Sequence, residues 1–326
     1  MEGFRNILVA TDFSPAAEAA LKQGVWLARV SGARLTLVHT LPDLRKVVHY
    51  ASAKAKLDLL YGEGHQFERE VRRPSDARLK QAIAALQAPD LDIQYETLIG
   101  DPVVEIVHAV QQEGYDLVLV GTRGRSVWER FFVGSTAKRL IRKCPSAVWI
   151  VKAEHSDPPH AILALTDFSD VSRRALLAAA WVAQRASAAL HLLHVIDSSD
   201  VPDDLIEKLP QGGSLREEIR SEAQQRLAQF LAGLPVPAEQ IHSHLSWGTP
   251  WKEIARLAQH EQIDLIALGT VGRSGVAGIL LGNTAEKVLD TCDCSVLTVK
   301  PEGFVSPIQP ACWPLHPGPS EDERPA

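Results

Sequence analysis

Short apolar runs, each bounded by turn residues, alternate along the chain with segments of helical periodicity. In the first half the runs read ILVAT, LTLVH, IQYETL, DLVLVG and AVWIV. Runs that are apolar throughout are typical of strands in parallel sheets, because helices cover both faces of such sheets. After TDFSP, Ser14 suits a helix N-cap and Pro15 the first helical position, and Leu21, Val25 and Ala28 then share one helical face. The pattern predicts a doubly wound α/β domain.

This pattern occurs twice. NILVATDFS at 6–14 matches AILALTDFS at 161–169 at an offset of 155, whereas CPSAVWIVK at 144–152 matches CDCSVLTVK at 292–300 at an offset of 148. The second copy is therefore 155 − 148 = 7 residues shorter in its middle. We predict two tandem domains at 1–153 and 161–300, joined by a linker at 154–160. The proline-rich tail at 301–326 is expected to be mostly disordered.

Composition narrows the class of protein. Apolar residues make up 45% and charged residues 23% of the chain, as in ordinary globular proteins. The net charge of −6 argues against a nucleic acid or an anionic membrane as the main partner. Four cysteines are too few for a disulfide scaffold, and the longest apolar stretch, at 175–183, is too short to span a bilayer. We expect a soluble, cytoplasmic protein.

Two glycine-containing loops occupy equivalent places in the repeat, as GTRGRSVWERFFVGSTA at 121–137 and GTVGRSGVAGILLGNTA at 269–285. Gly121 and Gly269 follow directly on an apolar run, and Gly134 and Gly282 precede a helical pattern. A helix start offers unpaired N–H groups and a positive dipole end, and glycine lets the backbone approach an anion closely. The loops predict phosphate-binding sites at the carboxyl ends of the strands. Ordinary turn glycines are the alternative.

These motifs resemble the universal stress protein family. The resemblance rests on Gly-x2-Gly-x9-Gly-Ser/Thr, on the TDFS turn after the first strand and on LLHV at the end of the second, and it covers about 4–152 and 160–300. It implies tandem Rossmann-like domains of the adenine nucleotide alpha hydrolase type, each a five-stranded parallel sheet in the order 3-2-1-4-5. It also implies binding of ATP or another adenine nucleotide, with or without Mg²⁺, since family members that keep the glycines bind nucleotide and others do not.

The family's nucleotide-binding positions can be carried over one by one. The aspartate after the first strand of each copy would face the ribose, and a residue at the end of the second strand would face the adenine. In the first copy the positions are Thr11, Asp12, Phe13, Thr40, Val120, Gly121, Thr122, Arg123, Gly124, Gly134, Ser135 and Thr136. In the second copy they are Asp167, Val195, Gly269, Thr270, Gly272, Gly282, Asn283 and Thr284. Neither a catalytic residue nor a metal ligand is predicted.

The two copies differ at the phosphate loop. The first has Ser135 where the second has Asn283, and asparagine is bulkier and offers no hydroxyl to a metal-bound water. The first loop also carries Arg123 and Arg125, whereas the second keeps only Arg273. We therefore expect the first site to bind nucleotide more tightly than the second.

The function predicted is a nucleotide-binding stress or signalling module, because the loops lack the paired carboxylates or lysine that phosphoryl transfer requires. A slow ATPase or phosphotransferase acting through Asp12 is one alternative, and a nucleotide-free scaffold that holds an apolar ligand is another. His39 and His194, at equivalent strand ends, are expected to be satisfied polar groups, and the basic residues after the first loop (Arg130, Lys138, Arg139, Arg142 and Lys143) a solvated helix face.

The last strands of the two copies would be exposed apolar edges if the domains stood apart, and such edges invite aggregation. The family resemblance also implies pairing at this strand. We therefore expect the copies to pack through SAVWIVK and CSVLTVK as an internal pseudo-dimer, with a further homodimer of chains possible.

Overall fold

The computed structural model describes residues 3–43, 65–122, 133–199, 212–272 and 281–310. Strands and helices alternate through both halves. The first half contains β1 (Asn6–Ala10), α1 (Pro15–Ser31), β2 (Arg34–Leu41), α4 (His65–Ala85), β3 (Ile93–Ile99), α5 (Pro102–Glu113), β4 (Leu117–Gly121), α6 (Ser135–Lys143) and β5 (Ala147–Val151). The second contains β6 (Ala161–Thr166), α7 (Asp170–Ala186), β7 (Ala189–Asp197), α9 (Gly212–Leu231), the short 3₁₀ helix η1 (Ala238–Gln240), β8 (Ile241–Gly248), α10 (Pro250–His260), β9 (Leu265–Gly269), α11 (Asn283–Thr291) and β10 (Ser295–Val299).

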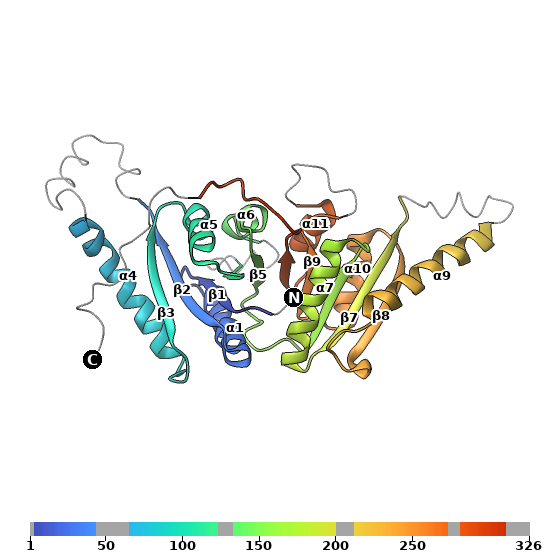
Figure 1. Cartoon of the computed structure of the whole chain (residues 1–326), viewed down its shortest axis with the longest axis horizontal. Helices are drawn as coiled ribbons and strands as arrows, with labels where there is room; N and C mark the ends of the chain where they lie inside the picture. Colours follow the sequence, from blue (N-terminus) through green and yellow to red (C-terminus); the bar gives the residue numbers. More distant parts are fainter. Residues whose placement is uncertain (1–2, 44–64, 123–132, 200–211, 273–280, 311–326) are drawn as a thin grey trace.

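The strands form one sheet in the order β3-β2-β1-β4-β5-β10-β9-β6-β7-β8, with α4 near one end of the molecule and α9 near the other (Figure 1). Within each half the strands are parallel and follow the order 3-2-1-4-5, so the predicted fold class is confirmed. The capping prediction is also correct, because the Ser14 hydroxyl accepts the N–H of Ala17 at 3.3 Å and Pro15 opens α1.

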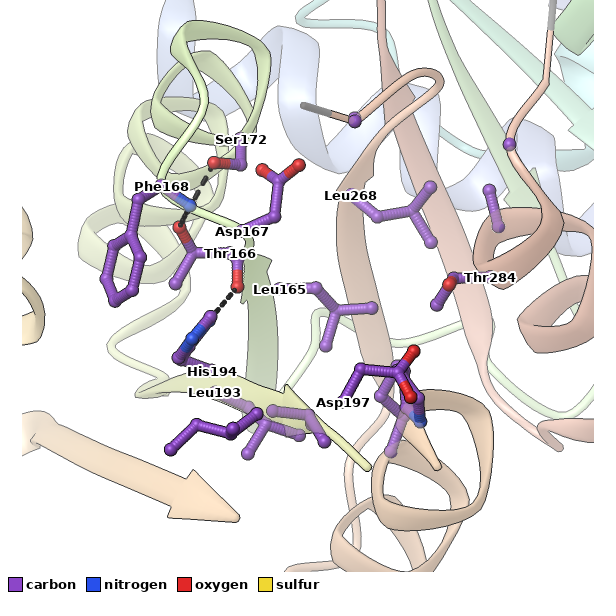
Figure 2. A pocket seen from close by; sticks show the side chains of 18 of the residues that line it. Leu165, Thr166, Asp167, Phe168, Ser172, Leu193, His194, Asp197, Leu268 and Thr284 are labelled. Atoms are coloured by element: carbon purple, nitrogen blue, oxygen red, sulfur yellow. Dashed lines mark hydrogen bonds between the residues drawn. The ribbon is translucent and has the colours of Figure 1, made fainter. Parts of the chain in front are cut away.

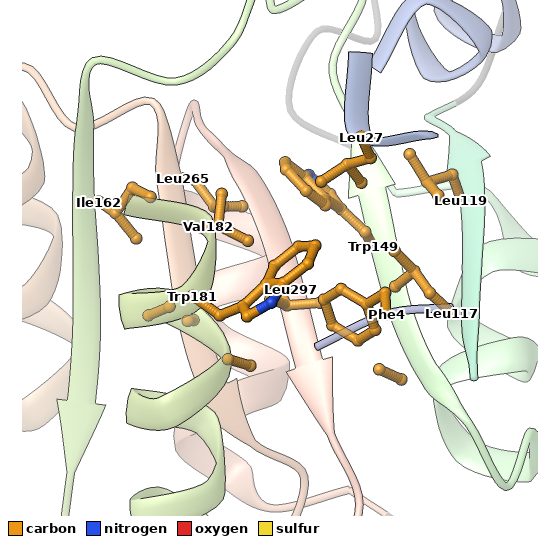
Figure 3. Close-up of a cluster of buried hydrophobic side chains, with 14 of the residues drawn as sticks. Phe4, Leu27, Leu117, Leu119, Trp149, Ile162, Trp181, Val182, Leu265 and Leu297 are labelled. Atoms are coloured by element: carbon orange, nitrogen blue, oxygen red, sulfur yellow. The ribbon is translucent and has the colours of Figure 1, made fainter. Parts of the chain in front are cut away.

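The two halves meet where β5 and β10 pair antiparallel, with Trp149 opposite Leu297. This is the contact that the edge-strand argument predicts. Apolar side chains on one face of the joined strands form a continuous cluster that includes Trp149, Leu297 and Leu119 (Figure 3). Phe4 from the first half packs edge-on against Trp181 of α7, with ring centroids 5.2 Å apart. The joint is therefore part of the core rather than a surface contact.

Each face of the sheet has one apolar cluster that spans both halves. Helices α1, α4, α7 and α9 contribute to one cluster, and α5, α6, α10 and α11 contribute to the other. Trp26 and Trp181 both pack with the first cluster, as expected of helix residues that face a sheet. Within the described part of the chain, every helix is too short or too polar to cross a bilayer.

Helix α6 carries basic side chains that pair with acidic ones, which corrects the expectation of a merely solvated face. Lys138 pairs with Asp290 and Arg142 pairs with Glu286 at 2.8 Å, so both bind α11 of the other half. Arg139 binds Asp101, the residue that caps α5, at 3.0 Å. The two ion pairs with α11 add to the joint between the halves, although each is partly exposed and contributes only about 0.2–1 kcal/mol.

The first part of the proline-rich tail lies along the first half, and the expectation of disorder is wrong for residues 301–310. The Ser306 hydroxyl donates to the carbonyl of Lys143 at 2.7 Å, and the Gln111 amide donates to the carbonyl of Ile308 at 3.0 Å. Ile308 also packs against the cluster of α5 and α6. Residues 311–326 lie outside the described residues.

Candidate functional site

A cavity of about 850 Å³ opens in the second half, at the carboxyl ends of β6, β7 and β9. Its inner wall is apolar and is built by Leu165, Leu193, Val195, Ile196, Ile254 and Leu268. Figure 2 shows Asp167 on one side of this space and Leu268 and Thr284 on the other. Its position is the crevice where open α/β sheets usually bind ligands, and its volume is typical of small-molecule pockets.

The sequence-predicted residues of the second copy all line this one cavity, although they come from three separated segments. They are Asp167 after β6, Val195 on β7, and Gly269, Thr270, Gly272, Gly282, Asn283 and Thr284 around β9 and α11. In the first copy Thr11, Asp12 and Phe13 follow β1, Thr40 lies on β2, Val120, Gly121 and Thr122 end β4, and Gly134, Ser135 and Thr136 begin α6. Arg123 and Gly124, like Arg125, Arg130 and Arg273, lie outside the described residues.

A tight turn aims Asp167 at the cavity. The Thr166 hydroxyl accepts the N–H of Phe168 at 2.9 Å, and the Asp167 carboxylate accepts the N–H of Ser169 at 3.1 Å. Phe168 adopts a φ of 64°, which is uncommon for a residue other than glycine. His194 supports this conformation, because its Nδ1 atom lies 2.8 Å from the carbonyl oxygen of Thr166 and its ring lies 4.2 Å from that of Phe168.

The first copy has the same turn. Phe13 has a φ of 61°, its N–H donates to the Thr11 hydroxyl at 3.0 Å, and the N–H of Ser14 donates to Asp12 at 3.0 Å. The Nδ1 atom of His39 lies 2.6 Å from the carbonyl oxygen of Thr11. Both histidines are thus satisfied polar groups, as predicted, and they hold the turn that positions each aspartate.

The glycines of the loops serve different purposes, although the sequence pattern predicted phosphate binding for all of them. A Cβ at Gly121 would lie 2.5 Å from the carbonyl carbon of Ala16, and a Cβ at Gly269 would lie 2.7 Å from Val171. These two glycines let a strand end pack against a helix start. Among the described residues, a Cβ at Gly282 would by contrast come within 4 Å only of the carbonyl oxygen of Thr270, at 3.7 Å. The described part of the chain therefore gives Gly282 no packing reason to be glycine, and the residue lines the cavity.

Helix α11 begins at the cavity, and no side chain of the described residues caps it. Its N-cap is Gly282, whereas Ser169 caps α7 by accepting the N–H of Ser172 at 3.2 Å. The first N–H groups of a helix have no acceptor within the helix. Here they belong to Asn283, Thr284 and Ala285, which all line the cavity. Helix α6 begins in the same way, at Gly134. A helix start of this kind attracts an anion through its N–H groups and its dipole.

Helix α9 supplies a wall of the cavity that sequence reasoning missed. Ile219, Ala223 and Arg226 line it, together with Glu222, which pairs with Arg226 at 2.7 Å. Ile219, Ala223 and Arg226 have the i, i+4, i+7 spacing of residues on one helical face, which indicates that this face packs against another part of the protein. The residues lie far from the recognisable motifs, so nothing in the sequence alone connected that face to the loops.

The charges around the cavity are mostly negative. Among the described residues that line it, Asp167, Asp197 and Glu222 are acidic and Arg226 is basic.

The first half keeps the basic residue of this set but has proline at two of the three acidic positions. The repeat offsets place Arg78 at the position of Arg226, whereas they place Pro42 at that of Asp197 and Pro74 at that of Glu222. An acidic residue, Asp43, follows Pro42. The Arg78 guanidinium lies 3.9 Å from the centre of the Phe13 ring, whereas that of Arg226 lies 5.7 Å from the Phe168 ring. The equivalent contacts support this alignment of α4 with α9.

Known proteins match the chain over most of its length. The profile of the universal stress protein family matches residues 3–152 and 159–300. Universal stress protein E of Photorhabdus laumondii is 25% identical over 319 residues, which cover 95% of this chain and 99% of that protein. Universal stress protein E of Escherichia coli K12 is 29% identical over 214 residues, or 64% of this chain and 68% of that one.

Solved structures show the same fold. A universal stress protein from Archaeoglobus fulgidus has a TM-score of 0.61 at 21% identity, covering 90% of this chain and 98% of its own. The match of the family profile to both halves agrees with the two strand orders and the two TDFS turns. The chain therefore belongs to the universal stress protein family and carries two domains of that family in tandem.

Proposed function

We propose that this protein binds ATP or a related adenine nucleotide in each half and acts in the cytoplasm as a stress-response or signalling module. The observation that carries the proposal is the cavity of the second half, which combines an apolar inner wall with the uncapped start of α11. An adenine nucleotide has the matching chemistry, since it joins a flat apolar base to an anionic phosphate chain through a sugar with hydroxyl donors.

Each part of the cavity suits one part of such a ligand. Val195, on the strand end that the family uses against the base, lies in the apolar wall where a purine would be shielded from water. Asp167 presents carboxylate oxygens, which accept hydrogen bonds from ribose hydroxyls. The N–H groups at the start of α11 would donate to phosphate oxygens, and the small size of Gly282 lets a phosphate come close to them.

We propose binding rather than hydrolysis as the function. Phosphoryl transfer is accelerated by cations that neutralise charge on the transferred group. The described lining residues of the second cavity hold three carboxylates and one arginine, which is itself paired with Glu222. Mg²⁺ bound with the nucleotide would lessen the repulsion between these carboxylates and the phosphates. The competing function, a slow ATPase, requires turnover that is lost in Asp12→Asn or Asp167→Asn.

The first experiment identifies the natural ligand. Protein purified without denaturation is unfolded, and the small molecules that it releases are identified by mass spectrometry. Release of an adenine nucleotide supports the proposal. Release of an apolar molecule instead would favour the scaffold function, for which the apolar inner wall is the supporting observation.

Calorimetry with magnesium-ATP then tests the site itself. The wild-type chain should bind two nucleotides, and Gly282→Ala should bind one, because the added methyl group occupies the space in front of α11. Gly213→Ala is the matched control, since a Cβ at Gly213 meets nothing within 4 Å and the residue does not line the cavity. Absence of binding to ATP, ADP and AMP in the wild type would refute the proposal.

A further inference from the structure

A cluster of histidines lies in the second half, apart from the cavity. His191 is on β7, His242 and His244 are on β8, and His260 and Glu261 lie at the end of α10. The Nδ1 atom of His191 and the Nε2 atom of His244 are 3.0 Å apart, and one potential ligand atom from each of His191, His244 and Glu261 lies within 4.8 Å of the other two. None of these five residues lines the cavity.

The donor set is that of a transition-metal site. Imidazole nitrogen and carboxylate oxygen are common ligands of Zn²⁺, which binds them at roughly 2.0–2.2 Å, so that two tetrahedral ligands stand about 3.3 Å apart. The pair His191 and His244 is already close to that spacing. The His260 ring nitrogen contacts Glu261 at 3.0 Å, and a contact of this kind fixes the orientation of a ligating carboxylate.

The His191 imidazole is buried and contacts a second imidazole, which suits a metal ligand. The residue is 5% exposed, and its Nδ1 atom faces the Nε2 atom of His244 at 3.0 Å. At this distance one ring donates an N–H to the other, whose facing nitrogen carries a lone pair that a metal can bind. Metal binding between the rings then requires only that the donating ring carry its proton on its other nitrogen instead.

The duplicated fold provides an internal comparison. The repeat offsets place Thr36, Gln94, Glu96 and Glu113 of the first half opposite His191, His242, His244 and Glu261. The strand register is the same, because Thr36 pairs with Gln94 as His191 pairs with His242. The fold thus forms without histidine at any of these positions. A purely structural role for the cluster leaves unexplained why three imidazoles gather in only one half.

We infer that His191, His244 and Glu261 bind a divalent first-row transition metal such as Zn²⁺, with His260 positioning Glu261. The site joins β7 and β8 to the end of α10. The other end of α10 contributes Pro250 and Ile254 to the cavity, so the metal would hold the helix that forms part of the cavity wall. The inference does not depend on the identity of the ligand in that cavity.

The experiment uses the full chain after treatment with a chelator, and zinc is added without nucleotide. Titration against a chromophoric chelator gives the affinity, and metal analysis after dialysis gives the stoichiometry. We expect one tightly bound Zn²⁺ per chain in the wild type and in His160→Gln, which removes an exposed histidine elsewhere. His244→Gln and Glu261→Gln should weaken binding by more than tenfold, and His260→Gln by roughly 10- to 100-fold.

Two readouts separate metal binding from damage to the fold. Thermal unfolding in chelator should be similar for wild type, Glu261→Gln and His260→Gln, whereas added zinc should raise the unfolding temperature of the wild type most. Bound Co²⁺ should give the visible absorption of a low-coordinate nitrogen and oxygen site. The inference is overturned if the wild type binds no more zinc than His244→Gln does. It is also overturned if His244→Gln and Glu261→Gln bind zinc as tightly as the wild type, since the metal would then bind only to exposed histidines.

Discussion

The carboxylate of Asp167 lies 2.7 Å from the point at which a Cβ on Gly272 would stand. The turn after β6 and the loop after β9 are therefore in contact across the mouth of the cavity, although they are far apart in the sequence. Any side chain at position 272 would displace Asp167 from the place where it faces the ligand. The loop and the turn form one wall of the cavity, so a substitution in either segment should shift the position of the other.

Unequal affinity of the two sites is the first prediction. The first site keeps Ser135 and Arg123 and has Pro74 and Pro42 where the second has Glu222 and Asp197, so it should attract phosphate more strongly. One charged hydrogen bond to phosphate contributes about 1.5–3 kcal/mol, or roughly 10- to 150-fold in affinity. Calorimetry with magnesium-ATP should show that Gly124→Val loses most of the tight binding, which belongs to the first site. Gly272→Val, which alters the weaker second site, should lose little of that tight binding. Equal affinities, or a more damaging Gly272→Val, would contradict it.

Asn283→Ser tests the same asymmetry from the opposite side. Asn283 is the first residue of α11 and lines the cavity, and serine would give the second site the hydroxyl that Ser135 gives the first. The variant should bind magnesium-ATP more tightly at the second site, with the first site unchanged. The same calorimetric titration measures both. Unchanged binding at the second site would mean that its acidic residues, and not the missing hydroxyl, limit its affinity.

The glycines should separate into structural and ligand-facing groups on mutation. Gly121→Ala places a methyl group against the backbone of Ala16, so it should lower the free energy of unfolding by about 1–3 kcal/mol. The methyl group of Gly282→Ala makes only an ordinary contact with Thr270 among the described residues, so it should leave stability unchanged while it removes nucleotide from the second site. Chemical denaturation in the absence of ligand measures the first effect and calorimetry the second. Similar stability losses in the two variants would show that the distinction is wrong.

Unfolding should be a single cooperative transition, because each apolar cluster runs through both halves. Leu297 is fully buried at the joint, so Leu297→Ala should cost about 2–5 kcal/mol and lower the stability of both halves together. Leu215→Ala, at an exposed position, serves as the control. Scanning calorimetry of wild type and variant measures this. Two separate transitions, only one of which moves in Leu297→Ala, would show that the halves fold independently.

Lys300 should make stability depend on pH in the alkaline range. The side chain is buried, its ammonium group donates to the carbonyl of Ile141 and lies 4.3 Å from the Phe304 ring, and burial lowers its pKa to about 8. An unfolded lysine keeps its proton up to about pH 10.5. Between pH 8 and 10.5 the unfolded chain therefore binds more protons, and the free energy of unfolding rises with pH through this group.

Comparison with Lys300→Met isolates that contribution. The stability of wild type relative to the variant should be lowest below pH 8 and should rise by on the order of 3 kcal/mol as the pH passes from 8 to 10.5. Denaturation curves at a series of pH values measure the difference. A difference that stays constant over this range would show that Lys300 keeps an ordinary pKa in the folded protein.

Most of the fold was predictable because the signals are local and repeated. The apolar runs mark the strands, Ser14 and Pro15 mark the start of α1, and the duplication repeats each signal. Pairing of β5 with β10 followed from the need to cover an apolar edge. The contact of Asp167 with Gly272, the wall formed by Ile219 and the gathering of His191 with His244 were not predictable. Each joins residues from separate elements, and their proximity depends on strand order and register rather than on any pattern along the chain.

Pairing of β5 with β10 inside one polypeptide also has an evolutionary consequence. In a dimer of identical chains, every mutation appears on both sides of the symmetry axis, so the two sites change together. Here a single substitution alters one half alone, and the interface persists at any protein concentration because its partner strands are covalently linked. Ser135 against Asn283, and Thr36 against His191, are differences that a dimer of identical chains could not have. Joining the two domains in one chain thus lets each half differ at its own site while the other keeps the shared framework.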